Sequence, residues 1–285
     1  METGAQKLNI LVSILLPVCG KAPYISEAIE SVLKQNLRDW ELIVISDPPI
    51  GKEVEKVIEE YLQKDSRFSY LKNETRMGFQ RSLNQGLEIL KGKYVARIDD
   101  DDVWLDPEKL KKQIEFLESN PDYVLIGTGA VVINHEGKEL YRFLEPESDN
   151  QIREYILYRN PFLHSSVVYR KNIVLSFGGY DEKLKGADDY DLWLKLGTIG
   201  KLHNFPYFWL KFRAPRNNDN IARVPRYLRT KEKIQIIKKH RKNYPHFFQA
   251  ICKDYLKLLY LLTISRFPKL DNWLYQKRQT SGWRI

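Results

Sequence analysis

The sequence predicts an α/β fold: a mixed, mostly parallel sheet flanked by helices, followed by a helical C-terminal tail. Two observations support this fold. In the first hundred residues, apolar segments of strand length alternate with segments of helical periodicity, which is typical of βαβ units. Basic residues then accumulate on helical segments near the C-terminus. A length of 285 residues, 43% of them hydrophobic, is enough for one large domain with a substantial core.

The individual elements follow from apolar runs and from the polar residues that end them. The expected strands are residues 9–17, 40–46, 68–71, 93–98 and 123–133, and the expected helices are residues 24–35, 53–63, 80–90, 227–242 and 246–265. Another helix should start with Asp106 as N-cap and Pro107 in the first turn, and run to Glu118. Residues 135–215 mix short helices and strands between glycines and prolines.

The positive charge is concentrated at the C-terminal end. The net charge is +9, but the segment from Arg223 onwards contains 16 Lys and Arg against 3 Asp and Glu. Its apolar residues are flanked by cations, and two interpretations fit this pattern equally well. The helices could lie on an anionic membrane surface, or they could pack on the rest of the chain while their charged side chains face solvent. Because the segment lacks a recognisable nucleic-acid-binding module, we expect no nucleic-acid partner.

Cysteine content and apolar run length bear on the cellular compartment. Cys19 and Cys252 show neither metal-ligand spacing nor the density of a disulfide scaffold, which indicates a reducing compartment. The longest apolar run of the tail, residues 258–262, is far shorter than the roughly 20 residues that span a bilayer. We therefore expect a cytoplasmic protein, with attachment at the cytoplasmic face of the membrane if the tail binds lipid.

Four consecutive aspartates, residues 99–102, directly follow the expected strand 93–98. Ligands of parallel α/β sheets bind at the carboxyl ends of strands. Adjacent carboxylates repel one another, and a divalent cation with a preference for oxygen ligands, such as Mg²⁺ or Mn²⁺, would neutralise them. The alternative is a solvated acidic turn in which Asp102 or Asp106 caps the next helix.

Three segments resemble, in order and spacing, the family 2 glycosyltransferases of the GT-A fold. They are VSILLPVCGKAPYISEAIESVLKQNLRDWELIVISD, NETRMGFQRSLNQGLEILKGKYVARIDDDD and GGYDEKLKGADDYDLWLKL. The resemblance implies a metal-dependent, inverting transferase that uses a nucleotide sugar, with a UDP-sugar as the first choice of donor. It also implies a glycan or lipid-linked acceptor and a role in cell-surface polysaccharide biosynthesis.

The same resemblance implies a division of the chain into functional parts. Residues 1–222 would form the catalytic domain, with a nucleotide-binding part (1–98) and a metal and acceptor part (99–222). Residues 223–285 would form a basic helical extension. Nothing in the resemblance specifies the donor sugar, the acceptor or the linkage.

The resemblance also assigns the metal and nucleotide contacts. Asp99 and Asp101 match the family's D-x-D motif, and Asp101 is expected to contact Mn²⁺ or Mg²⁺ directly. Such a cation would stabilise the charge that develops on the leaving diphosphate. Asp100, between them, is placed among the nucleotide-sugar-binding residues without a defined role. The other residues expected on the nucleotide side are Pro17, Asp47, Asn73, Arg76 and Gly78.

The third segment supplies the expected catalytic base. Asp188 and Asp189 match the family's acidic pair, and Asp189 occupies the position of the base that accepts the proton of the attacking hydroxyl. Aspartates at a helix start also stabilise the helix without any chemistry. Asp191, which shares a helical face with Asp188, and His164 are expected on the acceptor side. A buried structural histidine is the alternative for His164.

Several positions depart from the family's pattern. Cys19 replaces an aromatic residue, Pro48 interrupts a segment that is usually Asp-Asp-Gly-Ser, and Pro215 stands where a histidine ligand is expected two residues after Arg213. His203 is one possible substitute for that ligand. The departures favour an alternative, a catalytically impaired homologue that binds nucleotide or glycan. A metal-dependent nucleotidyltransferase is a second alternative, although LLPVCGKAP is a poor phosphate loop.

Overall fold

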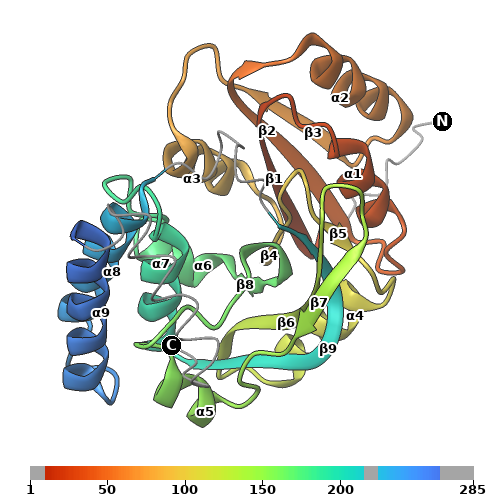
Figure 1. Cartoon of the computed structure of the whole chain (residues 1–285). Helices are drawn as coiled ribbons and strands as arrows, with labels where there is room; N and C mark the ends of the chain where they lie inside the picture. Colours follow the sequence, from red (N-terminus) through yellow and green to blue (C-terminus); the bar gives the residue numbers. More distant parts are fainter. Residues whose placement is uncertain (1–9, 215–223, 264–285) are drawn as a thin grey trace.

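The computed structural model describes residues 10–214 and 224–263, which form a strongly curved sheet covered by helices (Figure 1). The described strands form one sheet in the order β3-β2-β1-β4-β8-β6-β9-β5, with β7 paired to β6. The strands are β1 (Val12–Gly20), β2 (Trp40–Ile50), β3 (Phe68–Lys72), β4 (Tyr94–Arg97), β5 (Val103–Trp104), β6 (Tyr123–Ile133), β7 (Glu139–Phe143), β8 (Val168–Arg170) and β9 (Lys201–Arg213). The predicted α/β fold with a mixed sheet is confirmed.

Helices cover both faces of the sheet. They are α1 (Ile25–Leu33), α2 (Lys52–Lys64), α3 (Phe79–Ile89), α4 (Lys109–Ser119), α5 (Asp149–Tyr155), α6 (Lys171–Ser176), α7 (Asp188–Gly197), α8 (Arg226–Lys239) and α9 (Phe247–Leu262), with a 3-10 turn at His164–Ser166. Consecutive residues of β1 point to opposite faces and join separate cores. Leu15 joins the core formed with α3, α7, α8 and α9, whereas Leu16 joins the core formed with α1, α2 and α4.

The first half of the sheet is parallel, and this arrangement places the site. β1 pairs in parallel with both β2 and β4, with Leu15 opposite Ile43 on one side and Arg97 on the other. The carboxyl ends of these three strands therefore lie at the same edge. Asp47 of β2, Cys19 of β1 and Asp99 after β4 follow one another across that edge, as expected for a ligand site in a parallel sheet.

The second half of the sheet is mixed. β8 runs antiparallel to both β4 and β6, and the long strand β9 runs parallel to β6. The predicted strand 123–133 coincides with β6. The helix expected to start at Pro107 begins at Lys109, and the Asp106 side chain, the expected N-cap, accepts a 2.8 Å hydrogen bond from the amide of Glu108 just before it.

The described part of the basic tail packs against the rest of the chain. Ile234 and Ile237 of α8 and Ile251 of α9 are buried in the same apolar core as Trp193 of α7. Part of the tail is therefore a structural component of the domain, and binding of its exposed face to a membrane stays a prediction. Among residues 10–214 and 224–263, no helix is long and apolar enough to cross a membrane.

Candidate active site

The first aspartate of the 99–102 turn is anchored by charged and polar donors. Arg97, which is 0% exposed at the end of β4, donates from Nη2 to Asp99 Oδ1 at 2.6 Å and from Nη1 to the carbonyl of Leu15 at 2.9 Å. The hydroxyl of Ser165 donates to Asp99 Oδ2 at 3.1 Å. The turn therefore begins with a carboxylate held in a fixed orientation by a buried guanidinium.

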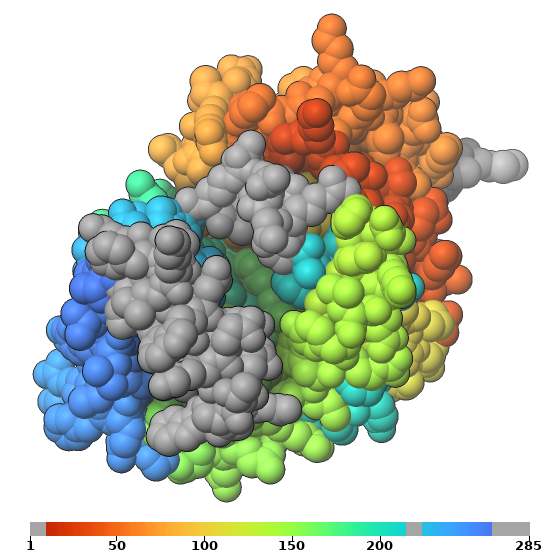
Figure 2. Space-filling model, in the orientation of Figure 1, coloured from red at the N-terminus to blue at the C-terminus, as the bar shows by residue number. Residues whose placement is uncertain are grey.

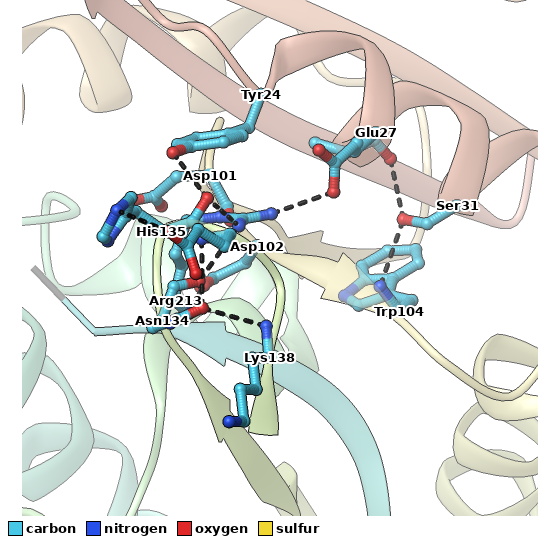
Figure 3. Close-up of polar contacts among 12 residues, drawn as sticks. Tyr24, Glu27, Ser31, Asp101, Asp102, Trp104, Asn134, His135, Lys138 and Arg213 are labelled. Carbon is cyan, nitrogen blue, oxygen red and sulfur yellow. Dashed lines mark hydrogen bonds and ion pairs between the residues drawn. The ribbon is translucent and has the colours of Figure 1, made fainter. Parts of the chain in front are cut away.

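The last aspartate of the turn is held by the end of β9 (Figure 3). Asp102 is 1% exposed, and its Oδ1 accepts a 2.9 Å hydrogen bond from the amide of Arg213, whereas its buried Oδ2 has no hydrogen-bond partner. The Arg213 guanidinium donates to the carbonyl of Asp101 at 3.0 Å. It also donates to the carbonyls of Asn134 and His135, at 3.2 Å each.

Arg213 also connects the aspartate turn to α1. Its guanidinium lies 3.7 Å from the ring centroid of Tyr24 and forms a 2.9 Å ion pair with Glu27 (Figure 3). One buried arginine thus joins the turn, the β6–β7 hairpin and α1. The sequence indicated Arg213 only as a marker for the position of Pro215, which lies outside the described residues.

The turn concentrates negative charge that its protein partners do not fully balance. Burial, together with the charges of Asp101 and Asp99, raises the pKa of Asp100 well above its ordinary value. The same causes raise the pKa of Asp102. Burial first, and the charges of Asp100 and Asp47 second, raise the pKa of the Cys19 thiol to about 11. A thiol this resistant to ionisation is not a nucleophile, which agrees with a packing role for Cys19.

These residues fit a hard divalent cation. The carboxylate oxygens of the turn are hard donors, and the buried Asp102 Oδ2 is an unsatisfied acceptor close to Asp99 and Asp101, the two residues expected to hold the cation. Among the described residues, no three His, Cys, Asp or Glu side chains already form a metal-binding group. A cation at this turn would therefore complete its coordination with phosphate oxygens and water, as Mg²⁺ commonly does in nucleotide sites.

Two of the expected nucleotide-side residues organise the loop before α3. Both carboxylate oxygens of Asp47 accept backbone hydrogen bonds, from Met77 at 2.7 Å and from Gly78 at 3.0 Å. Gly78 precedes α3 with φ +92°, a conformation that favours glycine. Asp47 therefore fixes the start of α3, and its contact with a nucleobase stays a prediction.

The other three nucleotide-side residues differ in accessibility. Asn73 is buried and donates to the hydroxyl of Ser82 at 2.9 Å, so its side chain supports the loop from inside. Pro17 is buried within β1. Arg76 is exposed on the loop before α3, and its charge lowers the pKa of Cys19. Of these three, Arg76 is the one exposed side chain, and its contact with a diphosphate stays a prediction.

The acidic pair at the start of α7 is held by neutral amides. Asp188 Oδ1 accepts from Gln80 of α3 at 3.0 Å, and its buried Oδ2 has no partner. Asp189 accepts from Asn160 at 2.8 Å and from the amide of Tyr190 at 2.7 Å. Burial, and then the charge of Asp188, raise the pKa of Asp189 to about 7. A carboxylate with this pKa can accept a proton near neutral pH.

The two aspartate clusters influence each other electrostatically. The charge of Asp99 contributes to the raised pKa of Asp189, and the charge of Arg97 acts on Asp188, so the groups lie within electrostatic reach. Gln80 reaches Asp188 from α3, the helix whose first turn is fixed by Asp47. The structure therefore brings together the ends of the parallel strands, the aspartate turn and the start of α7.

His164 lies behind the aspartate turn. Its Nε2 accepts from Arg97 Nε at 3.1 Å and lies 2.8 Å from Tyr180 Oη. Since Arg97 can only donate, Nε2 is an acceptor and the neutral ring carries its proton on Nδ1. Burial and the charge of Arg97 hold the pKa of His164 well below its ordinary value. These contacts support the structural alternative, with His164 orienting Arg97, over the expected acceptor-side role.

Asp191 lies among basic side chains. It is 1% exposed and lies 2.8 Å from Lys195, 3.1 Å from Lys239 and 3.5 Å from His240. Burial alone would raise the pKa of Asp191, but the interactions with His240, Lys195 and Lys239 lower it below its ordinary value. Asp191 therefore joins α7 to α8 through these contacts, and its expected acceptor-side role stays a prediction.

A residue of α8 supports the loop that carries the acidic pair. Glu232 accepts two hydrogen bonds of 2.9 Å, from the amide of Lys185 to Oε1 and from the amide of Gly186 to Oε2. No sequence signal connected Glu232 to the loop before Asp188.

His203, the suggested substitute metal ligand, stacks on Phe116 in an aromatic cluster, with the two ring centroids 4.7 Å apart.

Comparison with known proteins identifies the family. The family model for glycosyl transferase family 2 matches residues 13–182, which is more than half of the chain. The chain belongs to the family 2 glycosyltransferases. An uncharacterized glycosyltransferase of Methanocaldococcus jannaschii is 33% identical over 244 residues, which cover 83% of this chain and 81% of that protein. The amylovoran biosynthesis glycosyltransferase AmsE of Erwinia amylovora is 32% identical over 76% of this chain and 81% of its own length.

Solved structures support the GT-A fold of this glycosyltransferase. S. aureus TarS 1-349 in complex with UDP-GlcNAc matches with a TM-score of 0.65 at 18% identity, over 86% of this chain and 71% of that chain. The mannosyltransferase PcManGT of Pyrobaculum calidifontis, in complex with GDP-Man and Mn²⁺, matches with a TM-score of 0.64 at 17% identity. The match covers 96% of this chain and 76% of that chain. At 17–18% sequence identity, these structural matches show the fold alone.

Proposed function

We propose that this glycosyltransferase moves a sugar, with inversion, from a nucleotide-sugar donor to a hydroxyl of a glycan or lipid-linked acceptor, and that the reaction depends on Mn²⁺ or Mg²⁺. The observation that carries the proposal is Asp189, whose pKa of about 7 suits a general base and which lies within electrostatic reach of the aspartate turn. Polysaccharide biosynthesis is supported by AmsE and by the O-antigen biosynthesis glycosyltransferase WbnJ of Escherichia coli, which is 31% identical over 65% of this chain.

In this mechanism the aspartate turn receives the diphosphate. Asp99 and Asp101 would hold the cation, which supplies Lewis-acid stabilisation of the charge on the departing diphosphate. Arg97 keeps the Asp99 carboxylate in place, and Arg213 fixes the backbone carbonyl of Asp101. Arg76, exposed on the loop before α3, would pair with phosphate oxygens. Asp47 and Asp100 would contribute to nucleotide binding.

The acidic pair would carry out the chemistry on the acceptor. Asp189 would take the proton of the attacking hydroxyl as the bond to the sugar forms. Asn160 donates to the carboxylate and keeps one oxygen directed. Asp188, with its unpartnered and buried Oδ2, keeps the pKa of Asp189 high through its charge. The catalytic part would comprise residues 1–222, and residues 223–285 would form the basic extension.

A thermal-shift titration against UDP, GDP, dTDP and CDP, each with and without Mn²⁺, tests the proposal. A ligand that binds only the folded state raises its apparent stability by mass action. We expect one nucleotide to raise the melting temperature, and to do so more strongly with Mn²⁺. The solved TarS and PcManGT complexes suggest UDP and GDP as the first to test. No shift with any nucleotide would instead support the catalytically impaired homologue.

A further inference from the structure

Helix α9 exposes a stripe of apolar side chains. Phe248, Tyr255, Leu256 and Leu259 are between 46% and 76% exposed, and Cys252 beside them is exposed too. Successive residues of an α-helix are rotated by about 100°, so these five positions fall within an arc about 100° wide. Large apolar side chains gathered on one exposed helical face indicate an interaction surface.

The opposite face of α9 belongs to the protein core. Ala250 and Ile251 are buried in the core that contains α7, and Leu258 packs against it. α9 is therefore held in place by the domain, and the stripe is not needed to anchor it. α9 lies at the outer side of the molecule, on the other side from β7 (Figures 1 and 2).

The surface around the stripe is positive. Residues 224–263 contain 10 Lys and Arg and only 2 acidic residues. Both acidic side chains are engaged with the domain: Glu232 accepts the amides of Lys185 and Gly186, and Asp254 is buried and paired with Lys233 at 2.7 Å. The exposed charges of this helical pair are therefore cationic.

Cations lie directly beside the stripe. Lys238 of α8 donates to the Tyr255 hydroxyl at 2.6 Å, with its ammonium 5.2 Å from the ring centroid. Lys253 is exposed on α9 itself, next to the other edge of the stripe by helical rotation, and the exposed Lys257 lies one turn along, further round the helix. An apolar stripe edged by lysines is the pattern of a helix that lies in the interface of an anionic membrane.

We propose that the α9 stripe docks on the surface of an anionic lipid bilayer. The apolar side chains would enter the boundary between headgroups and acyl chains, while the lysines meet the anionic headgroups. A second copy of the chain is a poorer occupant, because a two-fold contact would bring the same cationic surface of each copy together. The inference goes beyond the proposed reaction and does not depend on it, since no substrate takes part.

Co-sedimentation of the full chain with vesicles tests the inference. Vesicles of phosphatidylglycerol mixed with phosphatidylcholine should bind the protein, and high salt should weaken binding. The double variant Leu256→Ser/Leu259→Ser should lower the partition coefficient at least about tenfold, because both apolar side chains lose their transfer into the interface. Lys253→Gln and Lys257→Gln should each lower it about fivefold.

Leu140→Ser provides the matched control. Leu140 is 54% exposed on β7, away from α9, and its variant should bind vesicles like the wild type. Unchanged melting temperatures would verify that all variants fold. Failure of the wild type to sediment with anionic vesicles, or equal binding by the double variant, would overturn the inference. So would concentration-dependent dimerisation that the double variant abolishes, since that result assigns the stripe to a second copy.

Discussion

The two aspartate clusters contain the same side chain, but the groups that donate hydrogen bonds to the carboxylates differ between them. At the 99–102 turn, a buried guanidinium holds Asp99 at 2.6 Å, and the end of β9 holds the Asp102 carboxylate and the Asp101 carbonyl. At the start of α7, the side chains that donate to Asp188 and Asp189 are the neutral amides of Gln80 and Asn160.

This difference explains how one residue type can serve two roles. A carboxylate with a charged donor is anchored as an anion, which suits the coordination of a cation. A buried carboxylate with only neutral donors can lose and regain a proton near neutral pH, which suits a base. Under the proposed function, the neighbours of Asp99 and Asp189, and not the aspartates themselves, would distinguish the nucleotide side of the site from the acceptor side.

The largest expected effect is at the base. Asp189→Asn should reduce the rate of sugar transfer by about 10²–10⁴-fold, because the amide cannot accept the proton of the attacking hydroxyl. The rate is measured with the donor whose nucleotide the thermal-shift screen identifies. Asp191→Asn is the comparison on the same helix, and its loss should appear mainly in stability. Near-normal transfer by the Asp189 variant would show that another group is the base.

The second effect concerns the anchor of the turn. Arg97→Leu should lower the free energy of unfolding by about 3 kcal/mol, because it leaves Asp99 and the carbonyl of Leu15 without their buried donor. Chemical denaturation measures the change. Arg142→Leu removes an ion pair of the same 2.6 Å length between exposed side chains, and the free energy of unfolding should fall much less than in Arg97→Leu. Equal losses would mean that the burial of Arg97 has no energetic consequence.

The third effect is a pH dependence. Asp189 must be ionised to act as a base, so its raised pKa predicts that transfer increases as the pH rises through about 7. Asn160 donates to the carboxylate and lowers that pKa. Asn160→Ala should therefore move the rising limb of the pH–rate profile to higher pH, by about half to one unit. A limb that stays in place or moves to lower pH would contradict the assignment.

The smallest effect concerns the support from α8. In Glu232→Gln, only one side-chain oxygen remains to accept the two amides of Lys185 and Gly186. Hydrogen exchange of these amides should become about five- to tenfold faster, as expected for one lost hydrogen bond. Glu118→Gln, which removes an exposed ion pair with Lys93, is the control and should leave them unchanged. If the amides of Lys185 and Gly186 exchange at the same rate in both variants, Glu232 does not support this loop.

The sequence predicted the fold and the parts of the site that are local in the chain. Strand 123–133, the aspartate turn and the helix start at Asp188 follow from apolar periodicity and from segments with a family resemblance. β9 was not predicted, because its partners are set by long-range pairing with β6 and not by local preference. Arg213 and Glu232 were missed as supports for the same reason, since each acts on residues that lie far away in the sequence.

The proposed roles of the two clusters, nucleotide and metal binding for one and proton transfer for the other, are tested most directly by nucleotide binding to the Asp101→Asn and Asp189→Asn variants. Isothermal titration with the nucleotide from the thermal-shift screen, in the presence and absence of Mn²⁺, measures it for both variants and the wild type. We predict that Asp101→Asn loses the metal-dependent part of the affinity, while Asp189→Asn binds like the wild type. Wild-type binding by the Asp101 variant, or loss of binding by the Asp189 variant, would contradict the division of roles.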